Sequence, residues 1–98
     1  MGDYSTTLGN LGRRARELRI LREMKQGELA ARAEVAPGTV VRFERTGRAS
    51  TENVLRIATA LGAEAAFDRL FERPEYRTLD EALERPALRK RVRTRRGT

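Results

Sequence analysis

The stretch QGELAARAEVAPGTVVRFE, residues 26–44, decides the predicted fold of the chain. Its first part predicts a short helix over residues 26–33, because Leu29, Ala30 and Ala33 recur at the spacing of one buried helical face. The next three residues are too few to form more than a turn. We therefore expect a second helix to begin directly after them.

Pro37 marks the start of that second helix, because proline suits a first helical position, where its missing N–H would have no partner anyway. Val40 and Phe43 lie three residues apart and predict the buried face of a helix that ends near Glu44. Two helices this short, joined by so few residues, cannot lie antiparallel. The sequence therefore predicts the crossed pair called a helix-turn-helix.

A longer helix is expected before the motif. It should begin near Thr7 or Asn10, which are both acceptable N-caps, and end near Glu23. Its predicted buried stripe consists of Leu8, Leu11, Ala15 and Leu18. Residues 1–7 are expected to form a flexible arm before the domain of residues 8–73.

Two further helices are expected after the motif. Ser50 or Thr51 should cap a fourth helix, and Gly62 should end it in a left-handed conformation. The predicted buried face of this helix holds Val54, Ile57, Ala58 and Leu61. A fifth segment over residues 63–72, ended by Pro74, carries on one side Ala66, Phe67, Leu70 and Phe71. These apolar residues should either complete the core or pack against a second copy of the chain.

Residues 74–98 are predicted to form an extension outside the domain. Thr78 and Glu81 have capping-box spacing and predict a short helix, which Pro86 would end. Residues 85–98 carry seven basic and no acidic side chains, so the net charge of +7 lies in this tail and the rest of the chain balances to zero. From residue 87 onward we expect disorder in the free protein, with the tail either binding DNA or a partner or serving as a solubilising end.

One set of residues spread over 11–62, slightly more than half of the chain, matches a known family pattern. It consists of Leu11, Ala15, Leu18, Arg19, Met24, Gln26, Leu29, Ala30, Val35, Val40, Glu44, Leu55, Ile57, Ala58, Leu61 and Gly62. On these residues the chain resembles the Cro/repressor-type helix-turn-helix family, also called the xenobiotic-response-element family. The resemblance implies an all-α, compact five-helix DNA-binding domain. The family usually has Glu-x-Gly after the second motif helix, whereas here the glycine, Gly47, stands one position later.

The resemblance also implies a structural ion pair. Arg19 of the first helix is expected to pair with Glu44 and so to tie that helix to the second helix of the motif, which in the resembled family is the recognition helix. Removing one partner of a pair shielded from water costs about 3–5 kcal/mol.

The residues that would contact DNA follow from the same resemblance. Gln26 is expected to contact a phosphate or to support base readout, and Thr39 to hydrogen-bond a phosphate. The groove-facing positions of the recognition helix hold Pro37, Gly38, Val41 and Arg42. Arg45 and Arg48, placed beyond the helix end, are interpreted either as phosphate clamps or as plain solvent-exposed side chains, and Lys25 has the same two interpretations.

Direct readout is expected to depend mainly on Arg42, because Pro37 and Gly38 have no side-chain donors. A guanidinium can bind guanine O6 and N7 together, a contact that contributes about 1–3 kcal/mol of discrimination. Val41 is suited to a thymine methyl group. So few donors imply either a short specific core in each half-site or reliance on DNA shape.

The composition argues against several other classes of protein. The chain has no histidine and no cysteine, so the commonest general base and thiolate metal ligands are absent, and we expect neither an enzyme nor a cofactor. No apolar run approaches the ~20 residues that cross a bilayer, and the N-terminus lacks the features of a secretion signal. We therefore expect a cytoplasmic protein with no membrane partner.

The functional hypothesis is a homodimeric transcriptional regulator, acting as a repressor of its own gene. A dimer would place two recognition helices ~34 Å apart on an inverted-repeat operator in double-stranded DNA. The alternative is the antitoxin of a toxin–antitoxin pair, similar to HipB-type proteins, which would bind its operator and also hold a toxin. The acidic segment 67–84 and the basic tail would suit such a protein partner, and the neighbouring gene would separate the two hypotheses.

Overall fold

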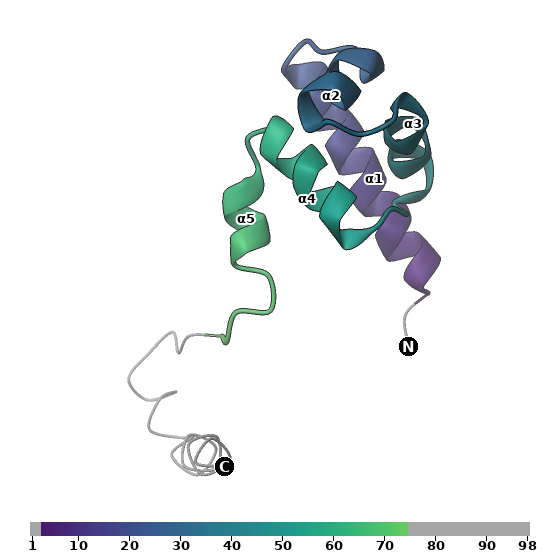
Figure 1. Cartoon of the computed structure of the whole chain (residues 1–98). Helices are drawn as coiled ribbons and strands as arrows, with labels where there is room; N and C mark the ends of the chain where they lie inside the picture. The colour runs from purple at the N-terminus through teal and green to yellow at the C-terminus, as the bar shows by residue number, and fades with distance from the viewer. Residues whose placement is uncertain (1–2, 75–98) are drawn as a thin grey trace, which may run out of the picture.

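Five α-helices form the framework of the computed structural model, which describes residues 3–74 (Figure 1). They are α1 (Tyr4–Leu21), α2 (Gln26–Ala33), α3 (Pro37–Thr46), α4 (Thr51–Ala60) and α5 (Glu64–Asp68). Residues 3–74 contain no strand, so the predicted all-α class is confirmed. No helix in this range is both long and apolar enough to cross a membrane.

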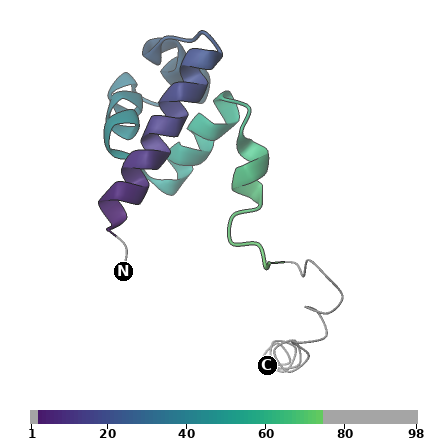
Figure 2. The ribbon, with the colours of Figure 1, turned by 180° about the vertical axis from the view of Figure 1, so that it is seen from behind.

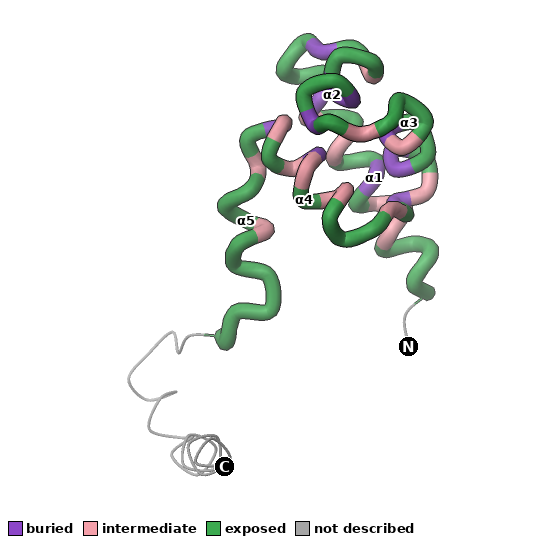
Figure 3. The backbone as a smooth tube through the Cα atoms, in the orientation of Figure 1, coloured by how far each residue is buried: buried purple, intermediate pink, exposed green. Residues whose placement is uncertain are grey.

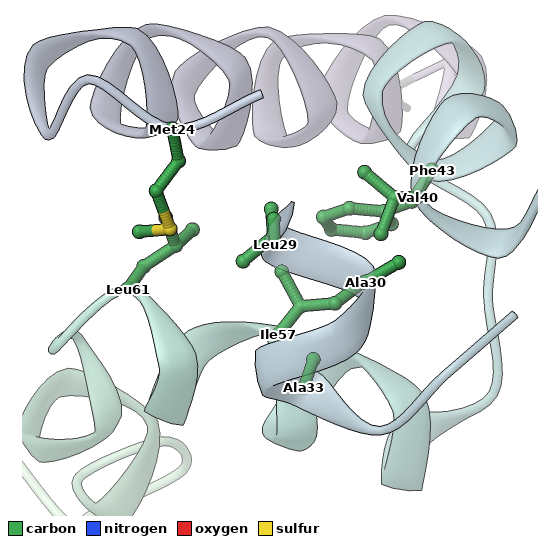
Figure 4. Packing of buried hydrophobic residues seen from close by; sticks show 8 residues of the cluster. All are labelled: Met24, Leu29, Ala30, Ala33, Val40, Phe43, Ile57 and Leu61. Atoms are coloured by element: carbon green, nitrogen blue, oxygen red, sulfur yellow. The ribbon is translucent and has the colours of Figure 1, made fainter. Parts of the chain in front are cut away.

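The core lies between the first four helices. Its eight buried apolar side chains, drawn in Figure 4, are Met24, Leu29, Ala30, Ala33, Val40, Phe43, Ile57 and Leu61. All the residues predicted to face inward from α2 and α3 belong to this cluster. Burying one large apolar side chain contributes about 1.5–3 kcal/mol, and this packing holds helices that are too short to be stable alone.

Left-handed residues and a proline form the turns before and after α3. Glu34 takes a left-handed conformation (φ 59°) after α2, and Pro37 occupies the first turn of α3, as predicted. Gly47 takes a left-handed conformation (φ 77°) and ends α3. The helix therefore reaches Thr46, two residues beyond the predicted end at Glu44.

The predicted boundaries of α4 are confirmed. The Ser50 hydroxyl caps the helix by accepting a hydrogen bond from the Asn53 N–H at 3.1 Å. Gly62 follows the helix in a left-handed conformation (φ 76°). The Arg22 guanidinium donates a hydrogen bond at 2.6 Å to the carbonyl oxygen of Leu61, which ties the end of α1 to the end of α4.

The prediction for the start of α1 was wrong by at least three residues. The helix begins at Tyr4 because the Asp3 carboxylate caps it, accepting a hydrogen bond from the Ser5 N–H at 3.0 Å. Residues 4–7 are therefore helical and do not form a flexible arm. The helix also ends earlier than Glu23, which takes a left-handed conformation (φ 59°).

The buried face of α1 also differs from the predicted leucine stripe. Leu11 is 37% exposed, whereas Gly12 and Arg19 are buried on this helix. The reason is that α1 packs against α3 through a close backbone approach at Gly12. A glycine gives no hydrophobic signal in the sequence, so periodicity selected Leu11 instead.

The fifth helix is shorter than predicted and adds no buried residue. Phe67 is partly buried, but Leu70 is 54% and Phe71 is 96% exposed, so the expectation that they complete the core is wrong. The chain turns after Asp68, with Phe71 in a left-handed conformation (φ 67°), before it reaches Pro74. Figures 1 and 2 show α5 extending away from the other four helices, and Figure 3 shows it almost entirely exposed. The predicted short helix after residue 78 and the basic tail lie outside the described residues.

Candidate nucleic-acid interface

The recognition helix α3 turns one face to the core and the other to solvent. Val40, Phe43 and Glu44 are buried, and they lie at the spacing of one helical face. The opposite face carries the residues that we predicted to face the groove. They are Pro37, Gly38, Val41 and Arg42, and all are exposed; Arg45, the predicted phosphate clamp, is exposed as well. In Figures 1 and 2, α3 lies at the outer edge of the group formed by α1–α4.

A shallow groove of about 390 Å³ lies between the first half of α3 and the start of α4. It is lined by Ala36, Gly38, Thr39, Arg42, Arg48, Ala49, Ser50 and Asn53. The structure thus brings four predicted site residues, Gly38, Thr39, Arg42 and Arg48, to one concave surface. Ser50 and Asn53 were not predicted here, because only the folding of α4 against the motif places them beside α3.

The two outlying arginines differ in position. Arg45 lies in the last turn of α3 and not beyond the helix end, because the helix continues to Thr46. Arg48 lies in the loop before α4, and Thr46 holds this loop. The Thr46 hydroxyl donates to the carbonyl oxygen of Arg42 at 2.8 Å and accepts from the Arg48 N–H at 3.1 Å. Thr46 therefore links the backbone of both groove arginines, a role that no sequence motif indicated.

No side chain of the cap or first turn neutralises the partial positive charge at the start of α3. Ala36 provides no side-chain cap, and the first turn contains no acidic residue. A helix N-terminus carries a partial positive charge, which is unneutralised here and favours an anion such as a phosphate. By contrast, α1 and α4 each begin with a side-chain cap.

The cations of this surface differ in how far they are already paired. Within residues 3–74, Arg42, Arg45 and Arg48 form no ion pair. Arg56, one turn into α4, instead binds Glu52 at 3.0 Å and Glu34 at 3.3 Å. The hydrogen bonds that Arg56 donates to the Glu52 carboxylate raise the pKa of Arg56, and the charge of Arg56 is already compensated.

Behind the exposed face, a buried polar cluster joins α1, α2 and α3. Arg19 and Glu44 are 8% and 7% exposed, and the structure contains the ion pair that the resemblance implied. Arg19 Nε donates to Glu44 Oε2 at 2.6 Å, and the second guanidinium contact, from Nη2 to Oε1, is 3.0 Å. Arg19 Nη1 donates to the carbonyl oxygen of Met24 at 2.8 Å.

Gln26, the first residue of α2, also belongs to this cluster. Its Nε2 donates to Glu44 Oε1 at 3.0 Å, and the side chain is half-buried. The resemblance implied a DNA contact for Gln26 but no bond to Glu44. Within the described part of the chain, no buried side-chain nitrogen or oxygen lacks a partner, and no group of acidic residues could hold a metal ion.

Comparison with known protein families identifies a family match over the region that contains this site. Residues 16–67 match the helix-turn-helix family, and this span includes the last part of α1, both helices of the motif, all of α4 and the groove between α3 and α4. The chain matched no curated protein and no solved structure.

Proposed function

The chain belongs to the Cro/repressor-type helix-turn-helix family of DNA-binding regulators, and from this premise we propose that it is a homodimeric repressor of its own gene. It binds an inverted-repeat operator in double-stranded DNA, in the cytoplasm. The observation that carries the proposal is the groove beside α3, where arginines that form no ion pair within residues 3–74 lie close to the uncapped start of the helix.

The residues around this groove suit the two kinds of contact that DNA offers. Arg42 on the exposed face of α3 reads a guanine through O6 and N7, and Val41 contacts a thymine methyl group. Thr39, Arg48 and Asn53, which line the groove, bind the phosphates on either side of the reading face; phosphate contacts position a protein on DNA without reading the sequence. Arg45 is exposed in the last turn of α3 and adds a phosphate contact there.

The exposed face of α3 can read few base pairs directly. Pro37 and Gly38 occupy the first turn of α3 and offer no side-chain donor to a base. Each half-site therefore has a short specific core around the Arg42 contact, and DNA shape supplies further discrimination.

Dimerisation follows from how little DNA one recognition helix can contact. Two copies of α3, separated by ~34 Å, reach successive major grooves of an inverted repeat. Leu70 and Phe71, which are exposed after α5, supply an apolar surface for a second copy. In the alternative function, the same surface of an antitoxin holds a toxin. A toxin-like reading frame beside the gene favours that alternative.

The test is a footprint on the DNA immediately upstream of the protein's own reading frame. We expect protection of an inverted repeat by the full chain. Arg42→Ala abolishes this protection, whereas removal of residues 87–98 only weakens it. Arg32→Ala serves as the matched control, because Arg32 lies at the far end of α2 and pairs with Glu28 at 2.8 Å. Loss of binding on tail removal together with no effect of Arg42→Ala would falsify the proposed role of α3.

A further inference from the structure

Glu44 holds two side chains in this structure, and only one of them is its ion-pair partner. Its Oε1 accepts from Arg19 Nη2 and from Gln26 Nε2, both at 3.0 Å. The carboxylate is buried, and Gln26 lies half-buried at the first position of α2. A buried residue is therefore hydrogen-bonded directly to a half-buried residue at the N-terminal end of α2.

The chemistry of this bond determines how Gln26 is oriented. An ionised carboxylate has no hydrogen to donate, so it can face only the NH₂ end of a carboxamide. The carbonyl oxygen of Gln26 must then point away from Glu44. One N–H of the carboxamide is used by Glu44, and the other N–H remains available as a donor.

We propose that Glu44 is a positioning residue for DNA binding, which holds Gln26 so that its remaining N–H donates to a backbone phosphate of the operator. This inference rests on the proposed function. Phosphate oxygens accept hydrogen bonds, so the N–H of Gln26 is the group that can meet them. The first helix of a helix-turn-helix crosses the DNA backbone while the second enters the groove, and Gln26 opens that first helix.

Positioning strengthens binding because a free glutamine side chain loses rotamer freedom when it contacts DNA. Here Glu44 restricts that freedom before DNA arrives, so less is lost on binding. The same carboxylate thus ties α1 to α3 through Arg19 and prepares a contact on the surface through Gln26. The two roles can be separated experimentally, since only the second one involves Gln26.

The experiment is a double-mutant cycle on the full chain, with the duplex defined by the footprint as the probe. Gln26→Ala is measured alone and in an Arg19→Met/Glu44→Met background. Replacing both partners of a buried ion pair by apolar side chains of similar length keeps a fold that removal of one partner would damage. We expect Gln26→Ala to weaken binding about tenfold in the natural background and less than about twofold in the double-methionine background. Thermal melting of each variant checks that it is folded.

A second measurement keeps the inference testable if the double-methionine background does not fold. Single phosphates of the duplex are replaced in turn by neutral methylphosphonates. We expect one position in each half-site at which this replacement weakens the natural protein about tenfold but leaves Gln26→Ala unchanged. Gln26→Glu, which has no N–H to give to either Glu44 or a phosphate, should bind no better than Gln26→Ala.

The outcomes separate this inference from the proposed function. An equal loss from Gln26→Ala in both backgrounds overturns the positioning role of Glu44, and so does the absence of a phosphate that responds to Gln26. If Gln26→Ala binds normally while Arg42→Ala does not bind, the inference fails and the proposed function stands. If Arg42→Ala binds normally, the proposed function itself fails.

Discussion

Gly12 of α1 lies so close to Phe43 of α3 that a Cβ atom on Gly12 would collide with the Phe43 carbonyl oxygen. The same Cβ would lie 2.8 Å from the carbonyl oxygen of Glu44 and 3.0 Å from the nitrogen of Gly47. Three backbone atoms at the end of α3 therefore surround this position. Backbone atoms cannot move aside as the end of a flexible side chain can, so α1 holds the recognition helix by direct backbone contact.

The first prediction compares two glycines of α1. Gly12→Ala should lower the free energy of unfolding by about 1–3 kcal/mol, because the added methyl group forces α1 and α3 apart. Gly9→Ala is the matched control, since a Cβ there meets no atom within 4 Å. It should raise the free energy of unfolding by about 0.5–1 kcal/mol, the usual gain from alanine in a helix. Urea unfolding measures both, and a Gly12→Ala variant as stable as the natural chain would contradict the packing described here.

The second prediction concerns the ion pair between α1 and α3. Arg19→Ala should lower the free energy of unfolding by about 3–5 kcal/mol, because it leaves Glu44 buried without its cation. Arg19→Met/Glu44→Met should be much closer to the natural stability, because no charge is then left unpaired. Urea unfolding of the three proteins tests this order. A double variant less stable than Arg19→Ala would show that the pair is not replaceable by apolar packing.

The third prediction uses the salt dependence of DNA binding. Arg48→Ala should reduce the slope of log K against log salt concentration by about 1 for each protomer, because one phosphate contact is lost. Binding should weaken by a similar factor on operator and unrelated DNA, since a phosphate contact carries no sequence information. Affinities measured at several salt concentrations test this. An unchanged slope would show that Arg48 does not contact a DNA phosphate. The control variant Arg32→Ala is expected to leave the slope unchanged.

The fourth prediction tests the exposed surface after α5. Phe71→Ser should shift the chain toward monomer in sedimentation experiments and leave the unfolding of the monomer almost unchanged, because Phe71 is 96% exposed. The matched control is Tyr4→Ser, which removes another exposed aromatic side chain, at the start of α1. If both variants associate as the natural chain does, the second copy does not use Phe71.

Much of the central fold could be predicted because its signals are local. Pro37 predicts the start of α3, Ser50 the cap of α4 and Gly62 its end, since each residue acts on the backbone within a few positions of itself. Periodicity likewise identified Leu29 and Phe43 as core residues, because a short amphipathic helix has only one face to bury.

Predictions that depended on distant contacts were less successful. Leu11 was expected to be buried because it is apolar and correctly spaced, yet the close approach of α1 and α3 buries Gly12 instead. Leu70 and Phe71 were expected on one face of a longer helix, but the chain turns away after Asp68. Helical periodicity shows which residues share a face, but not whether a neighbouring helix reaches that face.

The sequence by itself determined the all-α class, the two helices of the motif and the identity of the ion-pair partners, because these depend on residue types at short spacing or on a family pattern. Only the tertiary structure decided that Asn53 and Arg48 share a groove with α3, and that Gln26 is bonded to Glu44. Both arrangements join residues from different helices. Their distances are set by how the helices pack around Leu29 and Phe43, which no local pattern records.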